Sequence, residues 1–507
     1  MSRLSHAHDA EPDRPPYILQ TRQNQGILSA VNSWLRPSST RSPGAEYEPL
    51  YEEPTPLEDD IHGDRSDGGV PFSWLEYWLF VVIGMAMLWP WNMFLASAPY
   101  FQARFAGSPW ILQNFQSTIL TVSTVSNLIS MYILTNIQQT ASYPFRMKLA
   151  FVIETIVFLV LGLSTMFFVD ASPASYLVFT LLMVTVTALA TGLIQNGAFS
   201  FCASFGCAEY TQGLMAGQGI AGVLPSIAQV LVSLAAADDV GDSNSSSSSN
   251  SSNPTLSDGG VRSSTHAQMT WAFLPFLAAV VVCIGALVSL APLIRRHDRI
   301  IENRMVDRMA GSVHSIEEVE RVSRKVISIK GLLVKLFWPA ASIFMCFTVA
   351  MFFPVFTSKI LSVRTASDSS TSQSLSLFTP AAFIPLAFFF WNLGDLGGRV
   401  LTIIPLQVQH QPKMLFTISL LRFGFLPMYK LCNIGGRGAV ISSDLFYLML
   451  VQFPFGLTTG WLASSCMMAS ADWVEEGERE AAGGFMGLCL VAGLAAGSVL
   501  SFTASSA

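Results

Sequence analysis

Charged side chains are scarce in this sequence. Of its 507 residues only 12% are Asp, Glu, Lys or Arg, whereas 51% are hydrophobic. A soluble domain carries about 25% charged residues, so this composition excludes an ordinary soluble enzyme. The net charge is −6, and no basic surface is available to bind nucleic acid. The hydrophobic residues lie in long blocks, which predicts an all-α polytopic protein embedded in the lipid bilayer.

The sequence also lacks the motifs of several chemistries. Its seven cysteines form no CxxC pair, which disfavours a disulfide framework or a zinc site. There is no GxxxxGK[ST] motif for ATP hydrolysis and no HExxH motif, so we expect no metal, no cofactor and no catalytic residue. A GxGxxG match begins at Gly217 and includes Gly219 and Gly222, but it lies in an apolar segment rather than a βαβ unit. These glycines are better explained as close helix contacts.

Eleven apolar segments each have about the ~20 residues needed to cross ~30 Å of hydrocarbon. They lie at 74–98, 110–136, 147–169, 174–201, 210–236, 269–294, 332–356, 378–405, 413–433, 443–469 and 481–504. The segment before them is polar and shows no apolar periodicity, which is typical of a disordered tail. The chain is thus predicted to comprise a tail (1–72), a six-helix half (73–294), a linker loop (295–331) and a five-helix half (332–507).

The orientation in the membrane follows from the basic residues. The linker 295–331 holds nine Lys and Arg residues, and the positive-inside rule places it in the cytosol together with the N-terminal tail. The serine-rich stretch 237–268 then faces the exterior or an organelle lumen. It contains two glycosylation sequons, at Asn244 and Asn250, which agrees with that orientation.

Ionisable residues inside the apolar segments need an explanation, because each costs at least ~2.5–3.5 kcal/mol on insertion scales. Asp395 and Arg399 are one helical turn apart and can neutralise each other. They form either a structural ion pair or a polar floor for an uncharged, hydroxyl-rich solute. Gln195 offers an amide to a nucleobase edge, or else to a neighbouring helix. Trp91 offers a stacking face, or else packs into the bundle.

Four further ionisable residues lie within the apolar segments or at their ends. Arg146 and Glu480 are expected at cytosolic helix ends, where they could close an inner gate; an exposed pair is worth only ~0–1 kcal/mol and could break readily. The alternative role of Glu480 is to complement a helix N-terminus. Arg422 is interpreted as structural, and Glu154 as a weak candidate for a titrating group.

Six motifs in series resemble one family, the equilibrative nucleoside transporters. They are Pro90-Trp91-Asn92-Met93-Phe94 with Tyr100-Phe101, Gln195-Asn196-Gly197-Ala198, Met215–Gly222, Asn392–Arg399, Arg422-Phe423 with Pro427, and Gly460–Ser464 with Glu480–Gly483. The resemblance extends over about residues 74–504, with the motifs in order and at matching spacing. Any one of them is weak evidence; the series is specific.

The resemblance implies an eleven-helix fold akin to the major facilitator superfamily, and facilitated exchange of nucleosides or nucleobases. It also implies a cytosolic gate at the Arg146–Glu480 pair. The substrate contacts that it implies are Trp91, Gln195, Asp395 and Arg399. Two positions depart from the family pattern: Thr191 stands where Gly is common, and Trp89 where Leu is usual. Both departures put base selectivity and inhibitor sensitivity in doubt, but not the class of transport.

We therefore expect a nucleoside carrier that works by alternating access, with a midplane site between its two halves. Proton-coupled export from a vacuole or lysosome is an alternative, and a non-transporting nutrient sensor on the same fold is another. A membrane enzyme acting on lipid would need a His/Asp or Ser/His constellation, which is not visible. The membrane is the plasma membrane or a vacuolar or lysosomal one, and Tyr47-Glu48-Pro49-Leu50 fits a signal for sorting adaptors.

Overall fold

The structure is a computed structural model, and it describes residues 72–137, 142–168, 171–245, 258–311, 327–364, 376–404 and 410–505. These residues belong to one compact unit, Pro56–Ala507. The predicted tail 1–72, with its sorting signal Tyr47–Leu50, lies outside the described residues except for Phe72.

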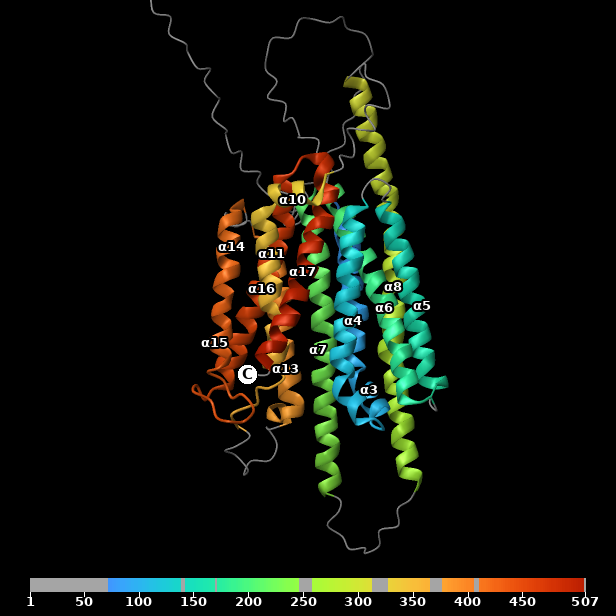
Figure 1. The fold of residues 1–507 in the computed structure, drawn as a ribbon, viewed down its shortest axis with the longest axis vertical. Coiled ribbons are helices and arrows are strands. Elements are labelled where there is room, and N and C mark those ends of the chain that lie inside the picture. Colours follow the sequence, from blue (N-terminus) through green and yellow to red (C-terminus); the bar gives the residue numbers. More distant parts are fainter. Residues whose placement is uncertain are drawn as a thin grey trace, which may run out of the picture. The chain divides into compact units, whose positions relative to one another are not determined.

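The first half of the chain forms long helices (Figure 1). They are α2 (Trp74–Ala96), the short α3 (Ala98–Phe105), α4 (Pro109–Asn136), α5 (Tyr143–Phe167), α6 (Pro173–Ser204), α7 (Ala208–Ser245) and α8 (Asp258–Gly311). Several begin with a proline in the first turn, where its missing N–H would have no partner in any case.

The second half is more segmented. Its elements are α10 (Ile329–Lys335), α11 (Phe337–Ala350), α12 (Phe352–Thr357), η2 (Ser376–Phe378), α13 (Pro380–Leu401), α14 (Pro412–Leu421), η4 (Arg422–Gly424), α15 (Phe425–Tyr429), the π-helix η5 (Phe446–Gln452), α16 (Phe453–Ala469), η6 (Ser470–Trp473), η7 (Glu476–Glu478) and α17 (Arg479–Ser505).

Ten helices within the described residues are long and apolar enough to cross a membrane. This confirms the prediction of a helical, multi-pass membrane protein. The predicted span at 413–433 is not among the ten, because its backbone divides into α14, η4 and α15. The count of eleven therefore stays a prediction.

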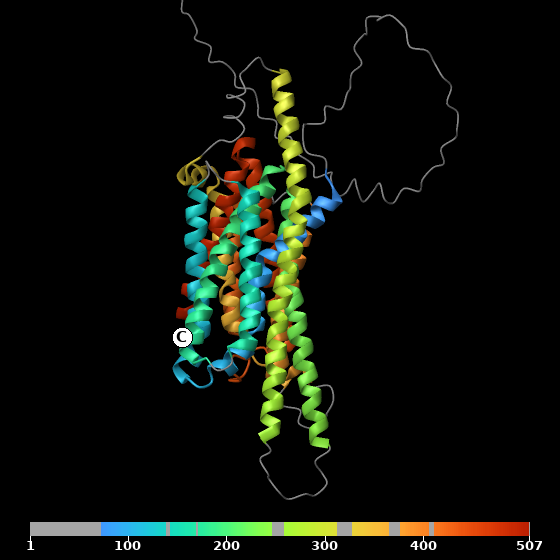
Figure 2. The same cartoon turned by 90° about the vertical axis from the view of Figure 1, so that its right-hand side faces the viewer.

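Two predicted loops are shorter than expected. Helices α7 and α8 continue into the serine-rich stretch, as far as Ser245 and from Asp258, and only 246–257 between them lies outside the described residues. Helix α8 also continues to Gly311, well into the predicted linker. Figures 1 and 2 show both helices extending past their neighbours. Hydropathy finds only the apolar part of a helix, whereas backbone hydrogen bonds continue into polar sequence.

The exposed faces of the helices are apolar, as lipid contact requires. On α5 the large exposed hydrophobic side chains recur every three or four residues: Phe145, Leu149, Val152, Ile156, Leu159, Leu163 and Met166. The opposite face of α5 is buried in the protein and contains Met147, Phe151, Glu154, Phe158 and Leu161. Glu154 therefore faces protein and not lipid.

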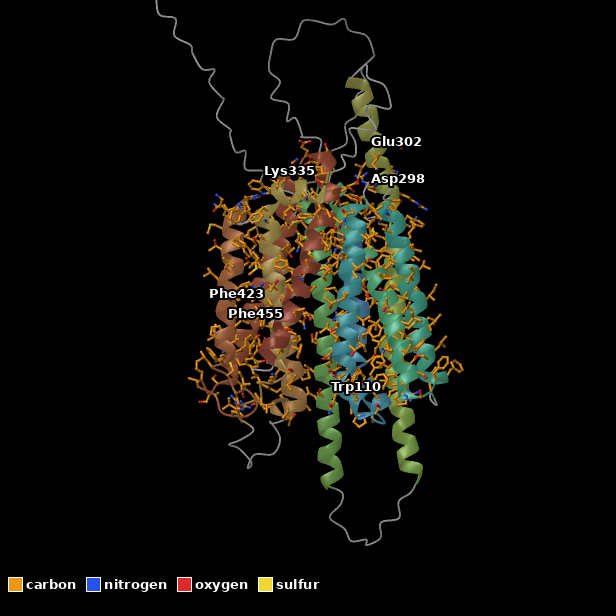
Figure 3. The ribbon with its side chains drawn as sticks, viewed as in Figure 1. Trp110, Asp298, Glu302, Lys335, Phe423 and Phe455 are labelled. Carbon is orange, nitrogen blue, oxygen red and sulfur yellow. The ribbon has the colours of Figure 1, made fainter. Side chains whose placement is uncertain are left out.

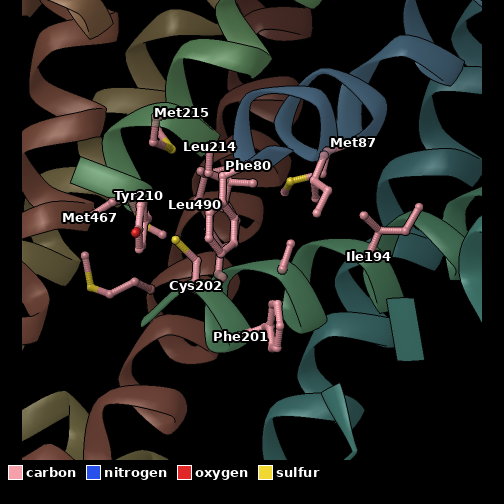
Figure 4. Packing of buried hydrophobic residues seen from close by; sticks show 14 of the residues in the cluster. Phe80, Met87, Ile194, Phe201, Cys202, Tyr210, Leu214, Met215, Met467 and Leu490 are labelled. Carbon is pink, nitrogen blue, oxygen red and sulfur yellow. The ribbon is translucent and has the colours of Figure 1, made fainter. Parts of the chain in front are cut away.

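Two groups of helices pack within themselves and meet along two seams. In the first group α2 packs on α7 and α8, and α5 and α6 pack on each other; in the second group α13 packs on α16, and α11 on α14, α16 and α17. Contacts between the groups run from α7 to α13 and α16, and from α17 to α4 and α6. One large hydrophobic cluster crosses these seams, with Phe80, Leu214, Met467 and Leu490 among its members (Figure 4).

The two ends of the bundle carry different elements (Figure 3). Asp298 and Glu302 of α8 lie at the same end as Lys335 of α10, whereas Trp110 at the start of α4 lies at the other. We call the first the α10 end and the second, which includes the short helix α3, the α3 end.

Candidate functional site

An ion pair lies in the interior of helix α13. Asp395 and Arg399 are both buried, and the Nε of Arg399 donates a hydrogen bond to Asp395 Oδ2 at 2.7 Å. Their i, i+4 spacing puts both side chains on one face of the helix. The structure therefore brings together the two residues as the sequence spacing predicts.

Arg399 also reaches the other half of the chain. Its Nη1 donates to the backbone oxygen of Met215 at 2.9 Å and to Gln218 Oε1 at 3.1 Å, both on α7. Gln212 completes the link, because its Nε2 donates to the Arg399 carbonyl at 3.1 Å while its Oε1 accepts from Tyr77 of α2 at 2.8 Å. The ion pair thus forms part of the seam between α13 and α7. Sequence reasoning missed Gln212 and Gln218, although two amides in an apolar segment are themselves a signal.

Glycines make the approach of these helices possible. A Cβ on Gly219 would lie 3.0 Å from Leu396 Cα, and one on Gly222 would lie 2.5 Å from Asn392 Oδ1, both on α13. A Cβ on Gly217 would lie 2.0 Å from the backbone oxygen of Val81 on α2. Gly217 therefore faces α2, whereas Gly219 and Gly222 face α13.

A second buried guanidinium lies beside the ion pair. Arg422 of η4 donates from Nη1 to the Cys346 carbonyl at 2.7 Å and from Nη2 to Thr459 Oγ1. It also interacts electrostatically with Asp395. Its contacts to α11 and α16 agree with the structural role expected for it, but its charge belongs to the environment of the ion pair. The positive charges of two guanidinium groups therefore act on one carboxylate.

One oxygen of the Asp395 carboxylate makes no hydrogen bond. Asp395 Oδ1 is buried and has no hydrogen-bond partner, and the same is true of Arg422 Nε. A buried polar atom without a partner costs ~1–3 kcal/mol, so each is a place where a ligand atom would be favoured. An excess of positive charge suits electron-rich oxygens, while Asp395 Oδ1 can accept from a hydroxyl.

Gln195 and Trp91 lie elsewhere in the first half. Gln195 is buried on α6, and its Oε1 accepts from Asn127 Nδ2 of α4 at 3.2 Å. Trp91 is partly buried on α2 and packs against an apolar cluster that includes Phe94 and Phe101. Within the described ranges, no hydrogen bond or ion pair joins either residue to Asp395 or Arg399.

The predicted gate residues belong to the seam between α17 and α6. Arg146 at the start of α5 is buried and donates to Asn196 Oδ1 at 2.5 Å and to the Ile137 carbonyl at 2.5 Å. Glu480 lies in the first turn of α17. A Cβ on Gly484, one turn further along α17, would lie 2.9 Å from Asn196 Nδ2. Asn196 is thus a contact that Arg146 and α17 share.

The remaining candidates are placed as follows. Glu154 is fully buried on α5, away from the ion pair. Asn244 lies in the last turn of α7, where only the backbone is described, and Asn250 lies outside the described residues. Within the described residues, no group of three His, Cys, Asp or Glu side chains is arranged to hold a metal ion.

Comparison with known proteins identifies the family. The profile of a family described as nucleoside transporter matches residues 181–248 and 263–505. Nucleoside transporter FUN26 of Saccharomyces cerevisiae is 30% identical over 468 residues, covering 84% of this chain and 83% of the relative. Equilibrative nucleoside transporter 1 of Mus musculus is 24% identical and covers 84% of this chain and 96% of the relative.

Solved structures agree on the fold. A double-tryptophan mutant of XylE, a major facilitator superfamily protein, aligns with a TM-score of 0.51 over 82% of this chain and 86% of that chain, at 12% sequence identity. An identity this low shows the fold alone, which is the major-facilitator-like arrangement that was expected. The family profile and the relatives show more: the chain belongs to the nucleoside transporter family, the family of the equilibrative nucleoside transporters.

Proposed function

We propose that this protein moves nucleosides across a membrane by facilitated diffusion, and that it does so by alternating access of one site between two helical halves. Membership of the family supports the substrate class. The two seams support the mechanism, because a carrier of this type works by rocking one half against the other around a central site.

The observation that carries the proposal is the ion pair of α13. Asp395 and Arg399 are buried where α13 meets α7, and Asp395 Oδ1 has no partner. We assign Asp395 to accept from ribose hydroxyls and Arg399 to donate to ligand oxygens. A ligand that binds here touches both halves, which is the requirement for coupling its binding to their movement.

We assign secondary roles to residues further from the pair. Gln195 would present its amide to the base, and Trp91 would offer a flat face for stacking. Arg146 and Glu480 would close the α10 end. The shared contact of Arg146 and α17 with Asn196 supports this last assignment.

We place the α10 end in the cytosol. The basic residues of 295–331 support this orientation. Sequons Asn244 and Asn250 then face the exterior or a lumen, and the tail with Tyr47–Leu50 is available to sorting adaptors. The plasma membrane and a vacuolar or lysosomal membrane both agree with this topology.

The test is uptake of labelled uridine and adenosine by cells without nucleoside carriers of their own. Asp395→Asn should reduce saturable uptake by tenfold or more, because it removes a charge-assisted interaction worth ~1.5–3 kcal/mol. Surface labelling controls for expression. Uptake equal to that of the unaltered protein would refute the assignment of Asp395. Binding of nucleoside without any uptake would instead favour the sensor.

A further inference from the structure

Helix α5 carries a carboxyl group in the middle of the membrane-spanning bundle. Glu154 lies near the centre of α5 and has no exposed surface. An ionisable side chain at this depth is costly and marks a functional site unless a partner neutralises it. The two helices packed against α5 are α6 and α8, and these supply its surroundings.

The groups that face this carboxyl are two hydroxyls and a thiol. From α6, Thr191 Oγ1 donates to Glu154 Oε1 at 3.2 Å, and the hydroxyl of Thr187 also faces the carboxyl. From α8, the thiol of Cys283 is close enough for an electrostatic interaction. In the part of the chain that the structure describes, no Lys, Arg or His pairs with Glu154. This distinguishes it from Asp395, which has a guanidinium partner.

Two oxygens at this place are left without partners. Glu154 Oε2 and Thr187 Oγ1 are both buried, and neither makes a hydrogen bond. An ionised carboxylate only accepts hydrogen bonds, whereas a protonated carboxyl also donates one. Thr187 Oγ1 can donate to an ionised Oε2 or accept from a protonated one, so that a single hydrogen bond can satisfy both atoms in either state of the carboxyl. Thr191 would continue to donate to Oε1.

We propose that Glu154, with Thr187 and Thr191, is a proton-binding site that couples nucleoside transport to pH, and that transport requires the proton to be bound. This inference rests on the proposed transport function and goes beyond it. The ligand is H⁺, taken up by Glu154 Oε2 and released from it; the step involves no other bond and no redox partner.

The position of the two threonines explains how the proton would act on transport. Thr191 lies one turn before Gln195 on α6, and α6 is the helix that meets α17 at the seam between the halves. A negative charge on Glu154 would lie in a dry interior without compensation, and would favour any rearrangement of α5 and α6 that admits water. Protonation therefore favours the packing seen here, and deprotonation opposes it.

The experiment uses the full chain, purified and reconstituted in liposomes with the same pH on both sides. Uridine counterflow is measured from pH 5 to pH 8. In the unaltered protein, uptake should fall with rising pH by about tenfold per unit above the midpoint, as one essential proton dictates. Glu154→Gln, which resembles the protonated carboxyl, should transport at all these pH values with a flat profile. Glu209→Gln, the same chemical change in the first turn of α7, should keep the pH dependence.

Thr187→Val provides a second readout if Glu154→Gln does not fold. It keeps the carboxyl but removes the hydroxyl that faces it, so the midpoint of the uptake profile should shift. A flat profile in the unaltered protein, or an unchanged profile in Glu154→Gln and Thr187→Val, would overturn the proposal.

A spectroscopic measurement separates this proposal from the proposed function. The infrared carbonyl band of a protonated carboxylic acid should be present in the unaltered protein and lost in Glu154→Gln. If uridine is not transported at any pH but the band is lost in the variant, the substrate assignment fails and the proton site stands. If uridine is transported and no such band changes, the proton site fails.

Discussion

A methyl group at Gly460 should separate α16 from α13 and disturb the ion pair. A Cβ at this position would lie 1.9 Å from the Asp395 carbonyl oxygen and 3.1 Å from Arg399 Cγ, whereas ordinary contacts begin at 3.4 Å. The helices would have to move apart by up to ~1.5 Å, because the atom that is met is backbone and cannot rotate away. Overpacking of this kind costs ~1–3 kcal/mol.

The assay for Gly460→Ala combines thermal unfolding in detergent with uridine uptake. We expect a lower unfolding midpoint and an uptake reduced by more than the loss of folded protein explains, because Asp395 and Arg399 move with α13. Gly285→Ala on α8 is the matched control, since a Cβ there would meet nothing within 4 Å. Ala is a better helix former than Gly by up to ~1 kcal/mol, so the control should be neutral or stabilising. An unfolding midpoint and uptake in Gly460→Ala equal to those of the control would refute the reasoning.

Two other contacts give predictions of the same kind. Lys335→Ala should lower the unfolding midpoint, because it leaves the fully buried Glu478 carboxylate without its 2.7 Å partner, at a cost of ~1–3 kcal/mol. Adding Glu478→Gln to this variant should recover much of the lost stability, and failure to do so would contradict the argument. Asn196→Ala removes a charge-assisted hydrogen bond from Arg146 and should lower the free energy of unfolding by ~1.5–3 kcal/mol in the same assay. Asn196→Asp keeps the acceptor and should not lower it. Equal unfolding midpoints for the two variants would contradict this prediction.

Sequence reasoning succeeded where the physical cause is local. Apolar blocks of the right length predicted eleven membrane spans, and ten helices within the described residues are long and apolar enough to be spans, since hydropathy and length are properties of one segment. The pairing of Asp395 with Arg399 followed from their i, i+4 spacing on one helix. The break of the span at 413–433 into α14, η4 and α15 was missed, although Gly424 and Pro427 lie within it.

Contacts between distant segments could not be predicted in the same way. Arg422 was interpreted as structural because nothing in its own segment relates it to Asp395, which lies on another helix. The bond from Lys335 to Glu478 joins residues 143 positions apart. The sequence indicates Glu154 only weakly as a functional residue, because its lack of a cationic partner depends on which side chains α6 and α8 present to it. Contacts that depend on how distant segments pack cannot be read from a single sequence.

The glycines of α7 differ in how closely they bring the backbone to each neighbouring helix. Gly217 and Gly219 are two positions apart, and therefore about 200° apart around the helix. A Cβ on Gly217 would lie 2.0 Å from the backbone oxygen of Val81 on α2, a neighbour in its own half. Across the seam, a Cβ on Gly222 would meet the side chain of Asn392, and one on Gly219 would lie 3.0 Å from Leu396 Cα. The closest backbone approach of these glycines is therefore made within the half to which α7 belongs, and the backbone approach across the seam is looser.

The glycines of helix α17 make close backbone contacts within its own half, and Gly483 makes one across the seam that must open if the halves rock. Within its own half, Gly493 and Gly497 meet the backbone oxygens of Phe344 and Thr348. Across the seam, Gly483 meets the backbone oxygen of Phe199, to which its Cβ would lie at 2.5 Å. Gly483 is four positions from Arg479 at the start of α17, at the same seam as Arg146 and Glu480. If two rigid halves rock against each other, this backbone contact cannot be kept by a change of rotamer. Opening of this end by such rocking therefore requires Gly483 and Phe199 to separate.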